Sequence, residues 1–152
     1  GRTIKLPTET QREYACRGGT TNWYYAGDTP ESLEGYENLA DISASKKFPK
    51  WKTLGFKDGY AFSAPVGKFK TNSLGLHDMS GNVWEWCRDT SFEKYPDRKR
   101  VDPTGAKTGD RRIIRGGGWK DDPRFCRSAY RVDSKTTFRY YVLGFRISCA
   151  TE

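Results

Sequence analysis

The fold of this chain is decided by the stretch Gly75-Leu76-His77-Asp78-Met79-Ser80-Gly81-Asn82-Val83-Trp84-Glu85-Trp86. Its apolar side chains follow neither the period of a helix nor the alternation of a strand, and they crowd around Gly75 and Gly81. This irregular pattern predicts a buried turn flanked by strands, so that loops lie inside the core. Glycines also let backbone carbonyls turn toward nearby carboxylates, which makes the stretch a candidate site for a hard cation.

Upstream of this stretch, residues 8–17 carry the clearest helix pattern in the chain. Thr8 is the expected N-cap, Gln11 completes a capping box three residues later, and Gly18-Gly19 ends the helix. From there to about residue 70, glycines and prolines recur so often that only short strands and ordered loops fit.

Downstream, two segments predict strands. Residues 111–115 are Arg-Arg-Ile-Ile-Arg and run into three glycines, and residues 143–147 form the expected final strand. The indole rings of Trp84, Trp86 and Trp119 are expected in the core, because a ring of that size near glycines packs against close backbone. Together these elements predict an α+β fold that is poor in regular secondary structure.

The composition limits the class of protein. A chain of 152 residues suits one domain, which we expect to span residues 1–152. Aromatic residues make up 14% of the chain and bury much area each, which argues against disorder. The net charge of +8 favours acidic partners, but basic and acidic residues alternate along the chain, so a solvated basic face is favoured over nucleic-acid binding. No apolar run is long enough to span a membrane.

The cysteines and the single histidine narrow the chemistry. Cys16, Cys87, Cys126 and Cys149 lie far apart and form none of the close pairs of a zinc knuckle or a redox motif. Two disulfides in any of three pairings, or small buried thiols, both remain open. His77 stands beside an aspartate and is expected to be a hydrogen-bonded structural residue rather than a base.

Several further motifs occur together in one order along the chain. They are Leu6-Pro7-Thr8-Glu9, Tyr14-Ala15-Cys16-Arg17-Gly18-Gly19, Asp58-Gly59-Tyr60, Ala64-Pro65-Val66-Gly67, Asn82-Val83-Trp84-Glu85-Trp86, Arg115-Gly116-Gly117-Gly118-Trp119, Arg127-Ser128-Ala129-Tyr130-Arg131 and Gly144-Phe145-Arg146. In these the chain resembles the formylglycine-generating enzyme family, also called the sulfatase-modifying-factor family. The resemblance covers nearly the whole chain and implies a variant of the C-type lectin fold.

The resemblance departs from the family's enzymes at one place. Those enzymes carry a Cys-x4-Cys pair after the glycine-rich turn, which holds copper and engages the substrate thiol. Here Asp121 stands five residues before Cys126. One thiolate and one carboxylate hold Cu(I) poorly, so we expect no copper, and we interpret Cys126 as a buried or disulfide-bonded structural residue. Under the alternative, a formylglycine-generating-type oxidoreductase or another enzyme of the family, Cys126 is the candidate catalytic thiol.

The resemblance also implies structural Ca²⁺, and we expect at least one ion. A first site would use the side chains of Asn38 and Asp58 and the carbonyls of Leu39 and Tyr60. A second site would use the carboxylates of Asp78 and Glu85 and the carbonyls of Gly81 and Val83. The alternative is that these acids cap turns. We further expect Arg127, Arg131 and Arg146 to pair with acids such as Glu85 and Asp89.

The segment 119–146 has the composition of a contact surface, because it mixes aromatic, small and charged residues without a helix or strand period. Most of these residue types are reachable from the asparagine codon AAC by changing only adenines. The segment thereby resembles the hypervariable part of the variable proteins of diversity-generating retroelements. The candidate ligand-binding residues are Asp121, Asp122, Phe125, Tyr130, Val132, Asp133, Ser134, Phe138, Tyr140, Tyr141 and Val142.

The sequence therefore predicts a non-catalytic ligand-binding protein, in which a Ca²⁺-supported scaffold displays a variable surface. The expected partner is a protein or another macromolecule that contacts residues 119–142. Nucleic acid is the less favoured partner, and it would bind with an affinity that falls steeply with salt.

Overall fold

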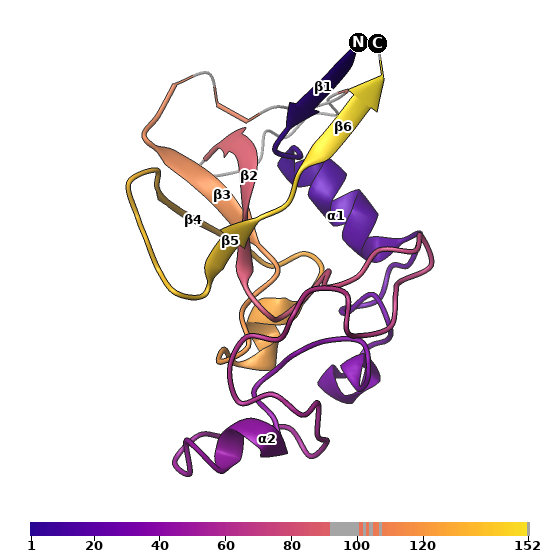
Figure 1. The fold of residues 1–152 in the computed structure, drawn as a ribbon. Coiled ribbons are helices and arrows are strands. Elements are labelled where there is room, and N and C mark those ends of the chain that lie inside the picture. The colour runs from indigo at the N-terminus through magenta and orange to yellow at the C-terminus, as the bar shows by residue number, and fades with distance from the viewer. Residues whose placement is uncertain (92–100, 102, 104, 107, 152) are drawn as a thin grey trace.

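The computed structural model describes residues 1–91, 101, 103, 105, 106 and 108–151. Most of the regular structure lies at the two ends of the chain, and the middle is built from ordered loops (Figure 1). The elements are β1 (Arg2–Lys5), α1 (Glu9–Arg17), a 3-10 helix (Pro30–Leu33), α2 (Ile42–Ser45), β2 (Trp84–Thr90), β3 (Arg111–Arg115), a second 3-10 helix (Pro123–Cys126), β4 (Arg131–Lys135), β5 (Leu143–Phe145) and β6 (Ser148–Thr151). The predicted α+β class, poor in regular structure, is confirmed.

The predicted first helix is confirmed as α1, with the expected ends. The Thr8 hydroxyl accepts a hydrogen bond from the Gln11 amide, and the Gln11 side chain accepts one from the Thr8 amide. Gly18 then adopts the left-handed conformation at φ 55° and donates its amide to the Tyr14 carbonyl. Thr8 and Gln11 thus satisfy two amides at the helix start that have no partner within the helix.

A four-stranded sheet is the main scaffold, and its strand order is β4-β3-β2-β5. The predicted strand 111–115 is confirmed as β3, which pairs antiparallel with both β2 and β4. The predicted final strand is shorter than expected, because β5 ends at Phe145 and a new strand, β6, begins at Ser148. β6 pairs antiparallel with β1, so the two ends of the chain lie together, and the sequence did not predict this ribbon (Figure 1).

Side chains on the two faces of this sheet differ. Glu85 of β2 lies opposite Arg115 of β3, and both are buried on the face toward α1, here called the inner face. Trp86 lies opposite Ile114 and Phe145 on the outer face. Trp86 is only half-buried, as is Trp84, whereas Trp119 has 4% of its surface exposed. The expected core position is therefore confirmed for Trp119 alone.

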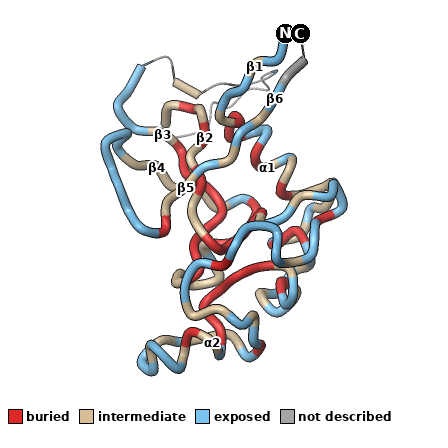
Figure 2. Tube along the Cα trace, viewed as in Figure 1, coloured by how far each residue is buried: buried red, intermediate tan, exposed pale blue. Residues whose placement is uncertain are grey.

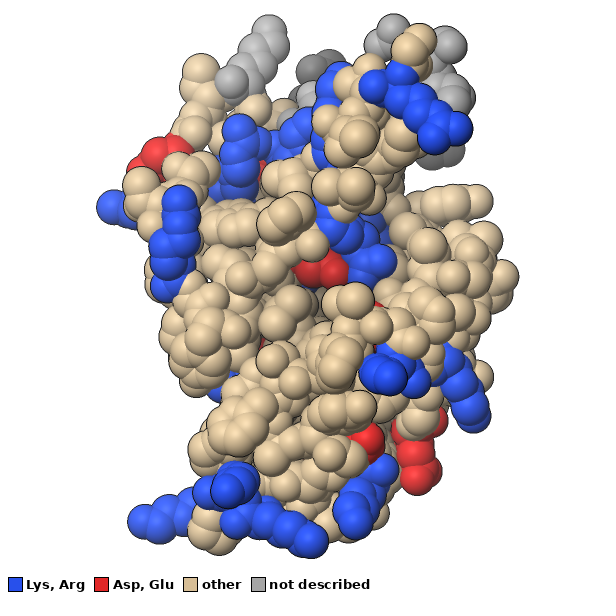
Figure 3. Space-filling model, viewed as in Figure 1, with Lys and Arg blue, Asp and Glu red and all other residues tan. Residues whose placement is uncertain are grey.

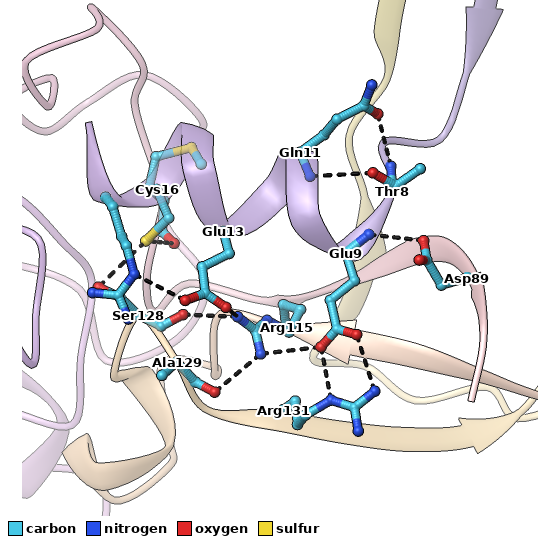
Figure 4. Close-up of polar contacts among 12 residues, drawn as sticks. Thr8, Glu9, Gln11, Glu13, Cys16, Asp89, Arg115, Ser128, Ala129 and Arg131 are labelled. Atoms are coloured by element: carbon cyan, nitrogen blue, oxygen red, sulfur yellow. Dashed lines mark hydrogen bonds and ion pairs between the residues drawn. The ribbon is translucent and has the colours of Figure 1, made fainter. Parts of the chain in front are cut away.

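A network of acids and arginines joins α1 to the inner face (Figure 4). The buried Arg115 donates to Glu9, at 3.2 Å, and to Glu13, and Arg131 donates to both oxygens of Glu9 at 2.8 and 2.9 Å. The backbone amide of Glu9 in turn donates to Asp89 at 2.7 Å. We call Glu9, Glu13, Arg115 and Arg131, together with Arg12, Glu85 and Arg146, the acid–arginine network.

The expected arginine pairs are partly confirmed. Arg146 binds Glu85 at 2.7 Å. Arg131 also pairs with an acid, Glu9, because its strand lies beside the start of α1. Arg127 donates to the Arg124 carbonyl and stacks on Trp23, and it forms no ion pair with any acid that the structure describes, contrary to the expectation.

The core below the sheet is made by loops, as the central stretch predicted. Tyr24, Leu33, Leu39 and Met79 are each at most 2% exposed and belong to one hydrophobic cluster. Buried segments run through the middle of the molecule and exposed segments surround them (Figure 2). His77 has its Nδ1 2.6 Å from the Phe69 carbonyl, which confirms a hydrogen-bonded role.

The four cysteines are free. Cys16, Cys87 and Cys126 are buried and Cys149 is exposed. The sequence left open two disulfides or small buried thiols, and three of the four cysteines are small buried thiols. None of the helices in the described part of the chain is long and apolar enough to cross a membrane.

Candidate functional site

The candidate ligand-binding segment contributes to a continuous group of aromatic rings centred on the buried Trp119. The Trp119 ring lies 6.4 Å from Tyr141 and 5.3 Å from Phe62, measured between ring centroids. Tyr141 lies 4.6 Å from Tyr140, which in turn lies 5.7 Å from Phe138. Phe48 and Trp51 stack 4.0 Å apart, and their ring centroids lie 5.9 and 5.8 Å from that of Trp119. These seven rings, Phe48, Trp51, Phe62, Trp119, Phe138, Tyr140 and Tyr141, are called the aromatic surface below.

The outer members of the aromatic surface are open to solvent. Tyr141 is 65% exposed, and Phe62, Phe138 and Tyr140 are 42–52% exposed. Large rings provide contact area at little cost in side-chain entropy, and such residues dominate binding surfaces. A buried anchor, Trp119, therefore carries a fringe of rings that a partner can reach.

Lys120 ties the two tyrosines together. Its ammonium lies 4.5 and 4.7 Å from the ring centroids of Tyr140 and Tyr141, and it donates to both hydroxyl oxygens, at 2.8 Å for Tyr141. The hydrogen bond from Lys120 lowers the pKa of the Tyr140 hydroxyl. Lys120 thus contacts the rings and the hydroxyls of both tyrosines, and side chains held in this way lose less entropy on binding.

Two other candidate residues, Phe125 and Tyr130, belong to a separate aromatic group. Their rings lie 5.0 Å apart. The Arg127 guanidinium stacks between Tyr130, at 5.9 Å, and Trp23, at 5.1 Å. Trp23 is 61% exposed and borders a cavity of about 460 Å³ with Arg127 and Tyr130. The candidate segment therefore presents two aromatic groups, and Trp23 was not predicted for either.

The two acids of the candidate set next to Trp119 have partners within the protein. One oxygen of Asp121 accepts hydrogen bonds from the Trp84 indole at 2.7 Å and the Gly118 amide at 3.0 Å. Asp122 caps the second 3-10 helix by accepting the Arg124 amide, and it forms an ion pair with Arg124 at 2.9 Å. Both carboxylates thus hold the backbone around the aromatic surface.

Three of the remaining candidates lie on β4, and Val142 immediately precedes β5. Val132 and Ser134 are half-buried on the outer face, and Asp133 lies on the inner face, where it binds Arg111 at 2.6 Å and accepts from Ser91. Val142 is 1% exposed and so does not lie where a ligand arrives. The structure therefore brings together only part of the candidate set.

Cys126 lies in the core with no exposed surface. Burial raises the pKa of its thiol well above the ordinary value. The thiolate is the reactive form of cysteine, so this position disfavours attack on a substrate. Asp121, at the place of the missing cysteine, points its carboxylate at Trp84 and Gly118.

The residues of the first expected Ca²⁺ site lie together. Asp58 accepts hydrogen bonds from the amides of Leu39, at 3.0 Å, and Tyr60, at 2.7 Å. The buried Asp41, which the sequence did not single out, accepts from the amide of Asp58. Burial, with the nearby Asp41 charge, raises the pKa of Asp58 to about 6. The buried Oδ1 of Asn38 has no hydrogen-bond partner, so this oxygen-rich donor set fits a hard cation.

The second expected set fits a cation less well. Asp78, Gly81, Val83 and Glu85 line one cavity of about 420 Å³ together with Arg146. Oδ1 of Asp78 is buried without a partner, as at the first set. The Glu85 carboxylate, however, is already held by Arg12 at 2.6 Å and by Arg146. Burial opposes ionisation of Glu85, but these two arginines keep its pKa below the usual range. In the described residues, no three His, Cys, Asp or Glu side chains gather as a metal site.

A basic segment beside the aromatic surface was missed by the sequence analysis. Lys46, Lys47, Lys50 and Lys52 are exposed and follow α2, where Figure 3 shows a cluster of basic side chains at the lower end of the molecule. Phe48 and Trp51 alternate with these lysines. Basic residues interleaved with aromatic residues are a pattern that could have marked this segment as part of the surface.

Comparisons with known proteins agree with this geometry. Residues 2–151 match the model of the family described as "Sulfatase-modifying factor enzyme 1-like domain". The chain is 38% identical over 135 residues to the formylglycine-generating enzyme of Streptomyces coelicolor, covering 88% of this chain and 41% of the relative. It is 33% identical to the enzyme of that name from Mus musculus, covering 97% of this chain and 39% of the relative. The chain thus spans about two fifths of the length of these relatives.

Among solved structures, the chain is similar to Treponema denticola variable protein 1. The TM-score is 0.78 at 28% sequence identity, and the match covers 96% of this chain and 47% of the other. The chain is thus similar in sequence to proteins named as formylglycine-generating enzymes and in structure to a protein named as variable.

Proposed function

The chain belongs to the sulfatase-modifying factor enzyme 1-like domain family, and within that family we propose that it is a non-catalytic ligand-binding protein. Its binding site is the aromatic surface, with the exposed rings of Phe138, Tyr140 and Tyr141 as the main contacts. One observation carries the proposal: the carboxylate of Asp121 is hydrogen-bonded within the protein, and the thiol of Cys126 is fully buried.

The chemistry of this segment supports a loss of catalysis. Two thiolates would hold Cu(I), but a carboxylate paired with one thiol is a mixed set that Cu(I) disfavours. Asp121 accepts hydrogen bonds from Trp84 and Gly118, and Cys126 is fully buried. Neither residue is placed to meet a substrate cysteine.

The exposure of the aromatic surface supports binding. Tyr141 is 65% exposed although its ring is held by Lys120 and by Tyr140. Ordered, exposed rings above a buried anchor are the arrangement that concentrates binding energy in a few residues. The partner is a protein or another macromolecule. The similarity to a protein named as variable supports a surface that differs between copies of the gene.

One structural Ca²⁺ at the first set completes the proposal. Asn38 and Asp58 would hold the ion with the carbonyls of Leu39 and Tyr60, and Asp41 would add negative charge beside them. The ion would neutralise two neighbouring carboxylates and fix the loop that precedes Phe62, a member of the aromatic surface.

The second candidate function is that of a formylglycine-generating-type oxidoreductase, and the identity to named enzymes of the family favours it. Oxygen uptake separates the two functions. The protein is supplied with Cu(I), a peptide that carries a cysteine, and a reductant, and uptake is compared with that of the Cys126→Ser variant. The non-catalytic function predicts no uptake above the variant. Peptide-dependent uptake that disappears in Cys126→Ser would establish the enzyme instead.

A thiol count provides an independent check of the buried sulfurs. Burial raises the pKa of the Cys87 thiol to about 12 and that of Cys126 further. We expect a thiol reagent at pH 8 to label the exposed Cys149 rapidly in the native protein, and Cys16, Cys87 and Cys126 only after unfolding. Rapid native labelling of Cys126 would contradict its assignment as a structural residue.

A further inference from the structure

The outer face of the four-stranded sheet carries a cavity that shares only Tyr140 with the contacts of the proposed function. It measures about 590 Å³ and lies between β2, β3 and β5 on one side and the loop 136–142 on the other. Trp86 and Phe145, which lie opposite each other on β2 and β5, contribute its aromatic wall. Arg112 of β3 and Arg139 of the loop also line it. The cavity thus combines aromatic rings with two guanidinium groups.

These two arginines differ from most others in the molecule, because backbone carbonyls hold them in place. Arg112 donates to the carbonyl of Arg88, and Arg139 donates to the carbonyls of Thr136 and Phe138, each at 2.9 Å. Neither forms an ion pair with an acid of the described residues. The arginines that do are Arg12, Arg17, Arg111, Arg115, Arg124, Arg131 and Arg146.

Within the described part of the chain, no acid forms an ion pair with Arg112 or Arg139. None of the described residues that line the cavity is acidic. A guanidinium has five donors in a planar fork, and one carbonyl or two use only part of them. The free donors match the oxygens of a phosphate or a carboxylate. The charge of the cavity lining therefore favours binding of an anion.

The aromatic rings of the cavity favour a ligand that also contains a flat ring. Phe145 is 67% exposed and Tyr140 is 42% exposed, and Trp86 is half-buried between the strands. An exposed ring of this size has apolar area to bury, and it stacks favourably on a flat partner. Because the rings and the guanidinium groups line the same cavity, one small molecule can meet both.

We propose that this cavity binds a small ligand that joins an anionic phosphate or carboxylate group to a flat ring. Arg112 and Arg139 bind the anion, and Phe145, Tyr140 and Trp86 contact the ring. This site goes beyond the proposed function, because Trp86 and Arg112 lie outside the segment 119–146 and Phe145 is not part of the aromatic surface. The site shares only Tyr140 with the aromatic surface, so variants of Arg112, Arg139 and Phe145 test it separately from the macromolecule that the aromatic surface binds.

Calorimetric titration with matched probes tests the site. Adenosine 5′-monophosphate places a phosphate on a flat ring, and indole-3-acetate places a carboxylate on one. Adenosine and indole-3-acetamide are their neutral counterparts. We expect at least one anion to bind, with its neutral counterpart at least about ten-fold weaker, as loss of a charge-assisted hydrogen bond requires. Binding of one anion alone shows which of the two combinations of anion and ring the cavity accepts. If neither anion binds at millimolar concentration, or if the neutral probes bind equally well, the proposal is wrong.

Variants locate the binding. Arg139→Gln and Arg112→Gln should each weaken the anion at least about ten-fold, and Phe145→Ala should weaken it further for ring-bearing probes. Arg139 and Phe145 are exposed, so both variants are expected to fold, and a thermal melt verifies this. Arg2→Gln, an exposed arginine on β1, is the matched control and should bind as the unaltered protein does. Equal binding by Arg139→Gln and the control would overturn the proposal.

Discussion

The acid–arginine network and the aromatic surface place their side chains under opposite conditions. In the network, Arg115 is 2% exposed and its donors meet Glu9, Glu13 and two backbone carbonyls. In the aromatic surface, Tyr141 is 65% exposed, and its ring contacts Trp119, Tyr140 and Lys120. Substituting one member of a buried, fully paired set of charges destabilises the fold strongly. Substituting an exposed ring changes stability little. This difference separates the part of the molecule that maintains the fold from the part that is free to recognise a ligand.

The largest expected effect comes from breaking the network. Arg115→Ala leaves the buried carboxylate of Glu9 and the half-buried carboxylate of Glu13 with fewer partners, and it should lower the free energy of unfolding by about 3–5 kcal/mol. Arg111→Ala removes an ion pair with Asp133 that is 45% exposed on the arginine side, and it should cost under about 1 kcal/mol. Urea unfolding measures both values. Equal losses would mean that the network has no special role in stability.

The aromatic surface itself should divide into an anchor and a fringe. Trp119→Ala removes a ring that is 4% exposed, and it should destabilise the protein by about 3–5 kcal/mol. Tyr141→Ala should change stability by no more than about 0.5 kcal/mol, because most of its ring faces solvent. A thermal melt of both variants tests the division. A loss for Tyr141→Ala as large as that for Trp119→Ala would place the tyrosine in the core.

A Ca²⁺ ion bound by the loops below the sheet should stabilise the folded protein. If Ca²⁺ is supplied at a hundred times its dissociation constant, it should stabilise the protein by about 2.7 kcal/mol, and a chelator should remove the gain. Asp58→Asn should abolish the dependence on Ca²⁺, because it removes the carboxylate at the centre of the first set. Melting curves with Ca²⁺ and with chelator provide the measurement. No response in the unaltered protein would rule out a stabilising ion.

The smallest effect concerns the start of α1. Thr8→Ala removes the hydroxyl that accepts the Gln11 amide and should cost about 1 kcal/mol. Thr10 is exposed and lies two residues after Thr8, in the first turn of α1. Thr10→Ala should cost less than half as much and serves as the control. Unfolding by urea again decides, and equal losses would show that the cap contributes little.

Local patterns could be predicted from the sequence because their causes are local. The capping box of Thr8 and Gln11 lies within one helical turn, and the strand 111–115 follows from its own residues. The pairing of β1 with β6 joins residues nearly a chain length apart, and no nearby residue specifies it. The same reason explains why the sequence predicted a carboxylate partner for Arg131 but did not identify it as Glu9.

The candidate site was predicted in part for a similar reason. Tyr140 and Tyr141 were expected at the surface and are exposed there, since their loop lacks any regular period. Val142 belongs to the same loop but turns into the core, and composition cannot distinguish inward from outward positions in an irregular segment. Phe48 and Trp51 reach Trp119 through the fold alone, so only the structure joins them to the site.

The gene itself offers the most direct test of a variable binding surface on an invariant scaffold. The DNA around the gene is sequenced and searched for a near-copy of the codons for residues 119–146. We predict a near-copy whose differences fall almost only at adenines, in codons such as those of Phe138, Tyr140 and Tyr141, and which leaves the codons of the network residues Arg131 and Arg146 unchanged. The absence of a near-copy, or differences spread evenly over exposed and network positions, would contradict the assignment of this surface as the variable one.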